Sequence, residues 1–117
     1  MKEFDLKERT KLYALRIIKL FRSLPRTADS QVIGKQILRS GTSVGAQYRE
    51  ACRSRSTSEF VSKMTSSLQE LDETAYWLEL LIDGGFVEED KLQPLRDETE
   101  QLIAIFVSSV KTAKTKS

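Results

Sequence analysis

The sequence contains no histidine and only one cysteine, Cys52, among its 117 residues. Without histidine, most zinc sites, Ser/His and Cys/His nucleophile pairs and imidazole acid–base catalysis are excluded. A single cysteine cannot form an internal disulfide, and we expect Cys52 to be a half-buried small apolar residue. Carboxylates alone could still bind a metal or act in catalysis, but the Glu-x-x-His pattern of ferritin-like bundles is absent. We therefore expect a protein that is not an enzyme, with no catalytic residues, no metal and no cofactor.

Long apolar runs are also missing. The longest, residues 102–107, falls far short of the roughly 18 residues that a membrane-spanning helix needs. The amino-terminal stretch MKEFDLKERTKLYALRIIKLF carries charges throughout, which is untypical of a secretory signal. With 39% apolar and 31% charged residues, the composition is that of a folded domain. We expect a cytoplasmic protein with no membrane partner.

The net charge is only +2, but it is distributed unevenly along the chain. Residues 1–63 hold 14 Lys/Arg against 6 Asp/Glu, whereas residues 64–100 hold 2 against 11. A basic half of this kind can bind nucleic acid. The alternative is that the basic and acidic segments attract each other, between helices of one chain or between subunits.

Proline is rare, with only 2 residues, and no stretch shows the apolar–polar alternation of a strand. Apolar residues instead recur at helical spacing, which predicts an all-α fold. Long helices joined by short turns are typical of an up-down-up-down antiparallel four-helix bundle. We expect a single domain, residues 1–117, with helices over 5–24, 28–53, 57–83 and 94–113 and a frayed tail over 114–117.

Local signals mark the ends of these helices. Pro25 ends the first helix, and Pro94 is expected as the first residue of the fourth. Residues 56–59 fit a capping box at the start of the third helix, and residues 83–85 fit a left-handed cap at its end. The third helix also carries a heptad-like apolar seam for packing against near-antiparallel helices. The predicted seam is Val61, Met64, Leu68, Leu71, Ala75, Leu78 and Ile82.

Three glycines, Gly34, Gly41 and Gly45, fall within the second helix and share one face of it. Each costs roughly 1 kcal/mol of helix stability relative to alanine. Small residues on one face let another helix backbone approach closely, a geometry best known from membrane helices. The alternative, a phosphate-binding loop in the segment GTSVG, fails because the lysine of a P-loop is missing and no strand precedes the segment. We therefore predict that the glycines serve helix packing.

Residues 75–82, AYWLELLI, are apolar on nearly every side, with Glu79 as their one charge. A surface helix of a small bundle normally keeps one polar face. Tyr76 and Trp77 are therefore predicted to contact a second subunit. The alternative is a wide core with one exposed aromatic side chain.

Three segments, VIGKQILRSGTSVGAQYREA, EFVSKM and LQELDETAYWLELL, resemble the bacterial four helix bundle proteins known as 23S rRNA intervening-sequence proteins. The combination of RS-x-TS-x-G-x-x-YREA with E-T-x-YWL is long and specific, and the resemblance extends over residues 12–110. It implies an up-and-down bundle that assembles into a ring-like homopentamer. The family is distantly similar to the accessory variability determinant of diversity-generating retroelements, a basic pentameric barrel that acts with a reverse transcriptase and nucleic acid. The partners implied are further copies of the chain, RNA or DNA, and a reverse transcriptase or another protein.

Charged and aromatic residues of the second and third helices match the family pattern and suggest a network that fixes helix register. Glu70, Glu73 and Trp77 share one face of the third helix. The two carboxylates can pair with Arg39 and Arg49 of the second helix, or with their copies in a neighbouring subunit. Tyrosine hydroxyls can add hydrogen bonds. The residues assigned to packing or interface roles are Gly34, Gly41, Gly45, Tyr48, Glu50, Glu70, Glu73, Tyr76 and Trp77.

The second interpretation of the basic residues is contact with phosphate groups. Positive charge follows the second helix into the next turn, and a ring of subunits would repeat it around its axis. Arg53 and Arg55 are the strongest candidates because no acidic residue adjoins them in the sequence; the alternative is a solvated helix end. The candidate nucleic-acid-binding residues are Lys35, Arg39, Arg49, Arg53, Arg55 and Lys63.

These patterns together predict a homo-oligomeric helical interaction module. In the first interpretation it binds nucleic acid, related to rRNA insertions or retroelements, through the basic surface of the second helix. The alternative is an oligomeric scaffold that binds only proteins and uses its charge asymmetry between subunits. Nucleic-acid binding with a steep inverse dependence on salt would favour the first.

Overall fold

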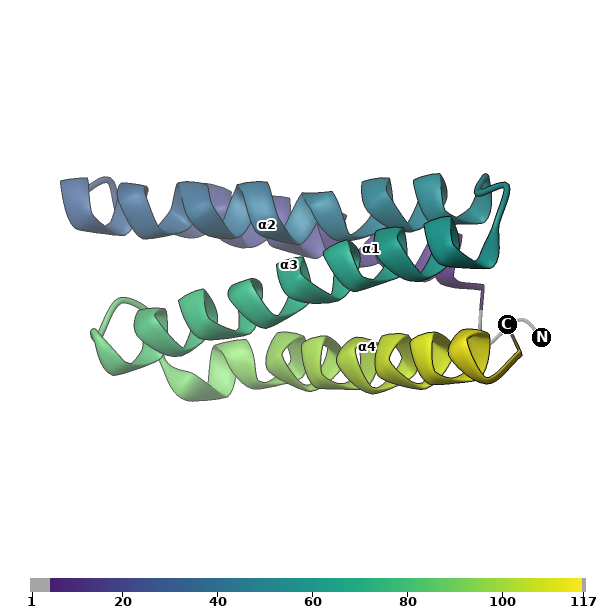
Figure 1. Ribbon diagram of the computed structural model, residues 1–117. Coiled ribbons are helices and arrows are strands. Elements are labelled where there is room, and N and C mark those ends of the chain that lie inside the picture. Colours follow the sequence, from purple (N-terminus) through teal and green to yellow (C-terminus); the bar gives the residue numbers. More distant parts are fainter. Residues whose placement is uncertain (1–4, 117) are drawn as a thin grey trace.

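Four α-helices account for most of residues 5–116, the part of the chain that the computed structural model describes (Figure 1). They are α1 (Leu6–Ser23), α2 (Ala28–Cys52), α3 (Thr57–Asp83) and α4 (Glu89–Lys116). The described residues form no strand, so the all-α prediction is confirmed. The helices pack into an elongated bundle with extents of 47 × 23 × 21 Å. Residues 1–4 of the predicted domain and residue 117 of the predicted tail lie outside the described residues.

Two helix ends follow the predicted signals. α1 ends at Ser23, because Leu24 precedes Pro25 and adopts an extended conformation instead of a helical one. After α3, Gly85 has a φ of 80°, the left-handed conformation that glycine adopts without a steric penalty. The chain can therefore turn sharply toward α4.

The start of α3 fits the predicted capping box only in part. Ser56 Oγ accepts a hydrogen bond from the Glu59 N–H at 3.0 Å, as a helix cap does. The Glu59 carboxylate, however, accepts from the Arg55 N–H at 2.7 Å, one residue before the cap. Both bonds hold the turn between α2 and α3 in place.

The prediction that the fourth helix begins at Pro94 is wrong, because α4 begins at Glu89 and contains the proline. Pro94 removes the N–H that would pair with the Asp90 carbonyl, but both residues are exposed, so water can reach that carbonyl. The additional turn buries Leu92, which is 3% exposed, and its acidic residues suit a helix N-terminus. At the other end α4 continues to Lys116, so residues 114–116 of the predicted frayed tail are helical.

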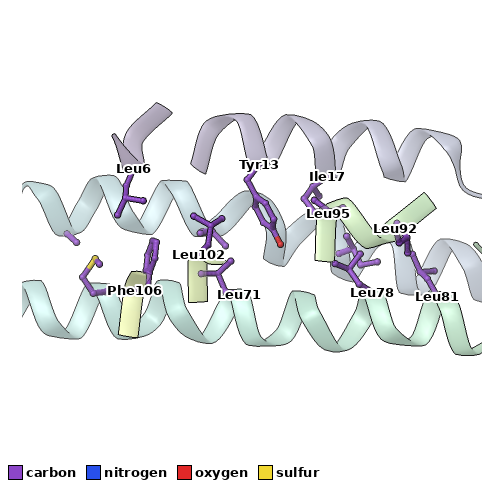
Figure 2. Packing of buried hydrophobic residues seen from close by; sticks show 14 of the residues in the cluster. Leu6, Tyr13, Ile17, Leu71, Leu78, Leu81, Leu92, Leu95, Leu102 and Phe106 are labelled. Carbon is purple, nitrogen blue, oxygen red and sulfur yellow. The ribbon is translucent and has the colours of Figure 1, made fainter. Parts of the chain in front are cut away.

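The core extends along the length of the bundle and receives side chains from every helix (Figure 2). Ile17, Ile37, Leu71 and Leu102, one from each helix, are all fully buried. Burying a side chain of this size contributes roughly 1.5–3 kcal/mol relative to leaving it in water. This apolar burial drives the packing of the four helices.

The apolar seam predicted for α3 is only partly correct. Met64, Leu71 and Leu78 lie in the core. The other members of the seam are only half-buried: Val61, Leu68, Ala75 and Ile82. Ser67 and Thr74 occupy core positions instead: Ser67 Oγ donates to the Val44 carbonyl at 2.7 Å, and the Ser40 and Thr74 hydroxyls lie 2.7 Å apart. These hydrogen bonds to α2 satisfy the polar groups and make their burial tolerable. The fully buried positions of α3 are Met64, Ser67, Leu71, Thr74, Leu78 and Leu81.

The glycine face of α2 lies against α1. A Cβ atom at Gly41 would come within 2.7 Å of Ile17, and one at Gly45 within 2.9 Å of Thr10. Gly34 faces the C-terminal end of α1 in the same way. This close approach places the exposed residues of α1 and α2 side by side on one surface.

Candidate nucleic-acid interface

Two of the six basic candidates are held by carboxylates of the bundle itself. The Arg39 guanidinium pairs with Glu73 and, at 3.2 Å, with Glu70. Lys63 Nζ lies 2.8 Å from Glu50 Oε1, and this hydrogen bond lowers the pKa of Glu50 and raises that of Lys63. Each pair joins α2 to α3, which matches the interpretation as a network that fixes register. Because their charges are already matched, Arg39 and Lys63 are weak candidates for phosphate contact.

Arg49 does not pair with Glu70 or Glu73 within the chain, so this part of the predicted network is wrong, and Arg49 lies at the contact between α2 and α1. Its Nη2 atom is 3.4 Å from the carbonyl oxygen of Lys7, and its side chain shares a groove of about 280 Å³ with Lys11. None of the described residues that line this groove is acidic. The two lysines were not selected from the sequence. Their spacing of four residues was visible there, but their position beside Arg49 depends on how α1 packs on α2.

Arg53 and Arg55 lie in the turn between α2 and α3, and both side chains are exposed. Neither side chain forms a hydrogen bond or an ion pair within residues 5–116. Arg53 is close enough to Glu50 to add a small lowering of the pKa of that carboxyl. Their charge is therefore available at the surface, which is compatible both with phosphate contact and with a solvated helix end.

Lys35 extends the basic surface along α2. It precedes Arg49 and Arg53 by 14 and 18 residues, about four and five helical turns, so the three share one side of the helix. We call this side of α2, together with the adjacent lysines of α1, the basic face. It consists of Lys7, Lys11, Lys35, Arg49 and Arg53.

Other polar residues of α1 contact α4. Arg9 forms a bidentate pair with Glu98, in which Nε and Nη2 each lie 2.8 Å from a carboxylate oxygen. The hydrogen bond with Glu98 raises the pKa of Arg9. Further along the same helices, the Tyr13 hydroxyl lies 2.6 Å from Thr99 Oγ1. Arg9 is therefore used in packing and does not belong to the basic face.

Most of the apolar run in α3 is accounted for by the core of the chain itself. Leu78 and Leu81 are fully buried, and Trp77 packs against the core while its Nε1 donates to Glu73 Oε1 at 3.3 Å. Tyr76 is 54% exposed, with its ring tilted by 60° against that of Trp77. Most of the run therefore packs within its own chain, and Tyr76 remains exposed.

Tyr48 and Cys52 lie one turn apart near the end of α2. Tyr48 is half-buried, with its ring centroid 5.8 Å from that of Phe106. Burial, together with a hydrogen bond to Cys52, raises the pKa of Tyr48 to about 12. Cys52 is exposed, so the prediction of a half-buried cysteine is wrong: it is the last residue of α2, where the helix leaves the core.

Within residues 5–116, no group of three histidine, cysteine, aspartate or glutamate residues is arranged to hold a metal ion. No helix of the same region combines the length and the apolar character that crossing a bilayer requires.

Comparisons with other proteins agree with the fold. The family model of the 23S rRNA-intervening sequence protein matches residues 2–108. Among solved structures, the chain is similar to a protein with unknown function from the S23 ribosomal protein family of Bacteroides thetaiotaomicron, with 35% identity and a TM-score of 0.84. The match covers 90% of this chain and 97% of the other, whereas a comparison with curated proteins finds no match. The chain therefore belongs to the 23S rRNA-intervening sequence protein family.

Proposed function

We propose that this protein is a non-enzymatic interaction module that binds nucleic acid through the basic face of α1 and α2. The observation that carries the proposal is the groove between these helices, where Lys11 and Arg49 lie together and the described lining residues include no acid. Two cations without a counter-charge attract an anion, and each phosphate that they neutralise releases counterions from the nucleic acid. This release is the main source of affinity in non-specific binding.

The proposed contact is with the phosphate backbone. From Lys35 to Arg53, the basic face extends over about 27 Å, given a rise of 1.5 Å per residue. That length can follow several consecutive phosphates. Lysine and arginine contacts to phosphates carry no sequence information by themselves, so we propose binding that tolerates changes of sequence.

We also propose that the chain is an up-down-up-down antiparallel bundle that assembles into a ring-like homopentamer in the cytoplasm. The order of contacts between α1 and α2 supports the antiparallel topology, since Thr10 faces Gly45 whereas Leu24 faces Gly34. The family resemblance supports the ring. Assembly would repeat the basic face in every subunit and raise the local positive potential.

The second candidate function is an oligomeric scaffold with protein partners only, such as a reverse transcriptase. It is favoured by the ion pairs of Arg39 with Glu70 and Glu73. In these pairs a cation of the basic half, residues 1–63, is neutralised by carboxylates of the acidic segment, residues 64–100. In that case the remaining cations would contact acidic residues 64–100 of a neighbouring subunit.

Fluorescence anisotropy with labelled structured RNA and duplex DNA, at low and physiological salt, tests the first proposal. We expect binding that weakens with salt, and Lys11→Gln/Arg49→Gln should reduce the slope of the log–log salt plot by about 1.4–1.8. The matched control is Lys91→Gln/Lys111→Gln, which removes the same charge from exposed positions of α4, outside the basic face.

Two outcomes would decide against nucleic-acid binding through the basic face. The first is absence of binding at low salt, where electrostatic attraction is strongest; it would favour the protein scaffold. The second is an equal loss of affinity in both double variants, which would show that only net charge matters. Light-scattering mass measured on the same samples tests the assembly separately.

A further inference from the structure

At one end of the bundle, α2 ends, α3 begins and α4 ends (Figure 1). Residues of these three segments line a groove of about 770 Å³. This volume is within the range of about 300–1,000 Å³ that is usual for small-molecule sites. The groove is separate from the basic face, since none of the basic-face residues lines it.

The lining of this groove combines hydroxyls, two cations and an apolar wall. Arg55 and Lys116 face it from the α2–α3 turn and from the last turn of α4, and the half-buried ring of Phe60 contributes to the wall. No aspartate or glutamate is among the described lining residues. The nearest acid in the turn, Glu59, already accepts a hydrogen bond from the Arg55 N–H. The hydroxyl-bearing residues of the lining are Ser54, Ser56, Thr57, Ser108, Ser109 and Thr112.

Ser54 provides an independent sign of a missing partner. Its Oγ atom is buried and has no hydrogen-bond partner within the described chain. A buried hydroxyl without a partner is uncommon, because each unsatisfied polar group costs free energy. Beside it, the first N–H groups of α3, beginning with Thr57, have no acceptor within their own helix and favour negative charge.

We propose that this groove binds an organic phosphate. The phosphate oxygens accept hydrogen bonds from the Arg55 guanidinium, the N-terminus of α3 and the Ser54 hydroxyl, whose side chain must rotate toward the groove to reach them, while Lys116 adds positive charge. The organic part packs against Phe60. The phosphate can belong to a free mononucleotide or to a nucleic-acid strand, and the second case rests on the proposed function above.

Amide spectra of ¹⁵N-labelled protein, titrated with adenosine 5′-monophosphate, adenosine, inorganic phosphate and a short oligoadenylate, test this assignment. We expect saturable shifts of the Ser54, Thr57 and Thr112 amides with the monophosphate, and weaker binding of adenosine and of inorganic phosphate. Saturable shifts of the same amides by the oligoadenylate alone would assign the site to a strand. Arg55→Gln/Lys116→Gln should weaken binding of the monophosphate at least about tenfold, because two charge-assisted contacts are lost. Ser54→Ala should weaken it as well, without lowering the melting temperature, because the hydroxyl that is removed has no partner in the chain.

The matched control is Lys11→Gln/Arg49→Gln, which removes the same charge from the basic face and should leave the groove shifts unchanged. The proposal is overturned if no probe gives saturable shifts at the groove, or if the two double variants weaken binding equally. Loss of nucleic-acid binding in the control variant with the groove shifts retained would support both proposals. Groove shifts from the monophosphate in a protein that binds no nucleic acid at all would overturn the proposed function and leave this site in place.

Discussion

The Tyr13 hydroxyl lies 2.6 Å from Thr99 Oγ1 and connects α1 to α4 within the core. Thr99 Oγ1 also donates to the Leu95 carbonyl at 2.8 Å, so the tyrosine is the donor of the pair. Both residues are only 1% exposed. Two hydrogen bonds in series therefore satisfy every donor of this buried polar pair and fix the register of the two helices.

Removing either partner of this pair should have unequal effects. Tyr13→Phe deletes one hydrogen bond and should lower the free energy of unfolding by about 1 kcal/mol. Thr99→Val leaves the Tyr13 hydroxyl buried without an acceptor and should cost more, about 1–3 kcal/mol. Urea unfolding of both single variants and the double variant measures the coupling. A Thr99→Val variant no less stable than Tyr13→Phe would contradict the assignment of donor and acceptor.

The same tyrosine should make stability depend on alkaline pH. Burial raises the pKa of Tyr13 above its ordinary value of about 10. In the unfolded chain the tyrosine has its ordinary pKa and therefore loses its proton at a lower pH than in the folded chain. The free energy of unfolding is therefore unaffected below pH 10 and decreases as the pH rises further. The expected loss is about 1.4 kcal/mol per pH unit above 10. Tyr48 acts in the same direction, because its pKa is raised to about 12.

Unfolding free energies of the native chain and of Tyr13→Phe, measured at successive pH values from neutral to strongly alkaline, check this dependence. The variant should lose stability less steeply above pH 10. Parallel curves would show that ionisation of Tyr13 does not oppose folding.

Gly41 should tolerate alanine less well than Gly34. A Cβ at Gly41 would lie 2.7–2.9 Å from three side-chain carbons of Ile17, which is fully buried. At Gly34 the nearest atom, also at 2.7 Å, is the single terminal methyl carbon Leu24 Cδ1, and the next contacts, with the Phe21 ring, are 3.1 Å or longer. Gly41→Ala should therefore cost about 1–3 kcal/mol from overpacking, despite a gain of roughly 1 kcal/mol in helix propensity.

Gly34→Ala is the matched control, since both glycines lie in α2 and gain the same propensity. Thermal unfolding of the two variants gives the comparison, and introducing Gly41→Ala into an Ile17→Ala background should remove most of its cost. Equal destabilisation by the two alanines would contradict a specific contact between Gly41 and Ile17.

The sequence was sufficient for the helices but not for every core position. Apolar periodicity correctly placed Met64, Leu71 and Leu78 in the core, because helical spacing alone determines which side chains share a face. It could not place Ser67 and Thr74, whose burial depends on hydrogen bonds to α2. Polar residues are assigned to the surface unless their partners are known, and the partners come from tertiary packing.

The candidate site was predictable to the same limited extent. Arg49 and Arg53 were identified from the distribution of charge along the chain. For Arg39 the sequence left two roles open, pairing with glutamates of the third helix and contact with phosphate. The side-chain geometry decides between them, because Arg39 pairs with Glu70 and Glu73 of α3. Lys7 and Lys11 were missed because they belong to another helix, and charge counted along the sequence does not show which helices are neighbours.

Arg9 should contribute more to stability than Arg39, although both pair with glutamate. The Arg9 and Glu98 side chains are 24% and 17% exposed, against 49% and 41% for Arg39 and Glu73. A bidentate, partly buried pair is expected to contribute about 1.5–3 kcal/mol, and an exposed pair under about 1 kcal/mol. Arg9→Met and Arg39→Met both keep an apolar stem, so urea unfolding compares the charges. A larger loss for Arg39→Met would contradict this order.

Two exposed leucines of α1 should determine self-association. Leu12 and Leu15 are each 51% exposed and line a groove of about 480 Å³ beside Arg16 and Lys19. The groove also holds the Arg9–Glu98 ion pair, so the cations left to attract the acidic segment, residues 64–100, of a neighbouring copy are Arg16 and Lys19. Leu12→Gln/Leu15→Gln should therefore lower the light-scattering mass to that of a smaller assembly or a monomer, with helix content unchanged.

The control for this assembly is Val32→Gln/Val107→Gln, which also removes two exposed apolar side chains, 64% and 39% exposed, but leaves the α1 groove intact. It should retain the mass of the native chain. If the control variant dissociates instead and the leucine variant does not, the subunit contact lies on another surface. If the native chain itself is monomeric at every concentration, the acidic and basic segments balance each other within one bundle, and the proposed ring is excluded.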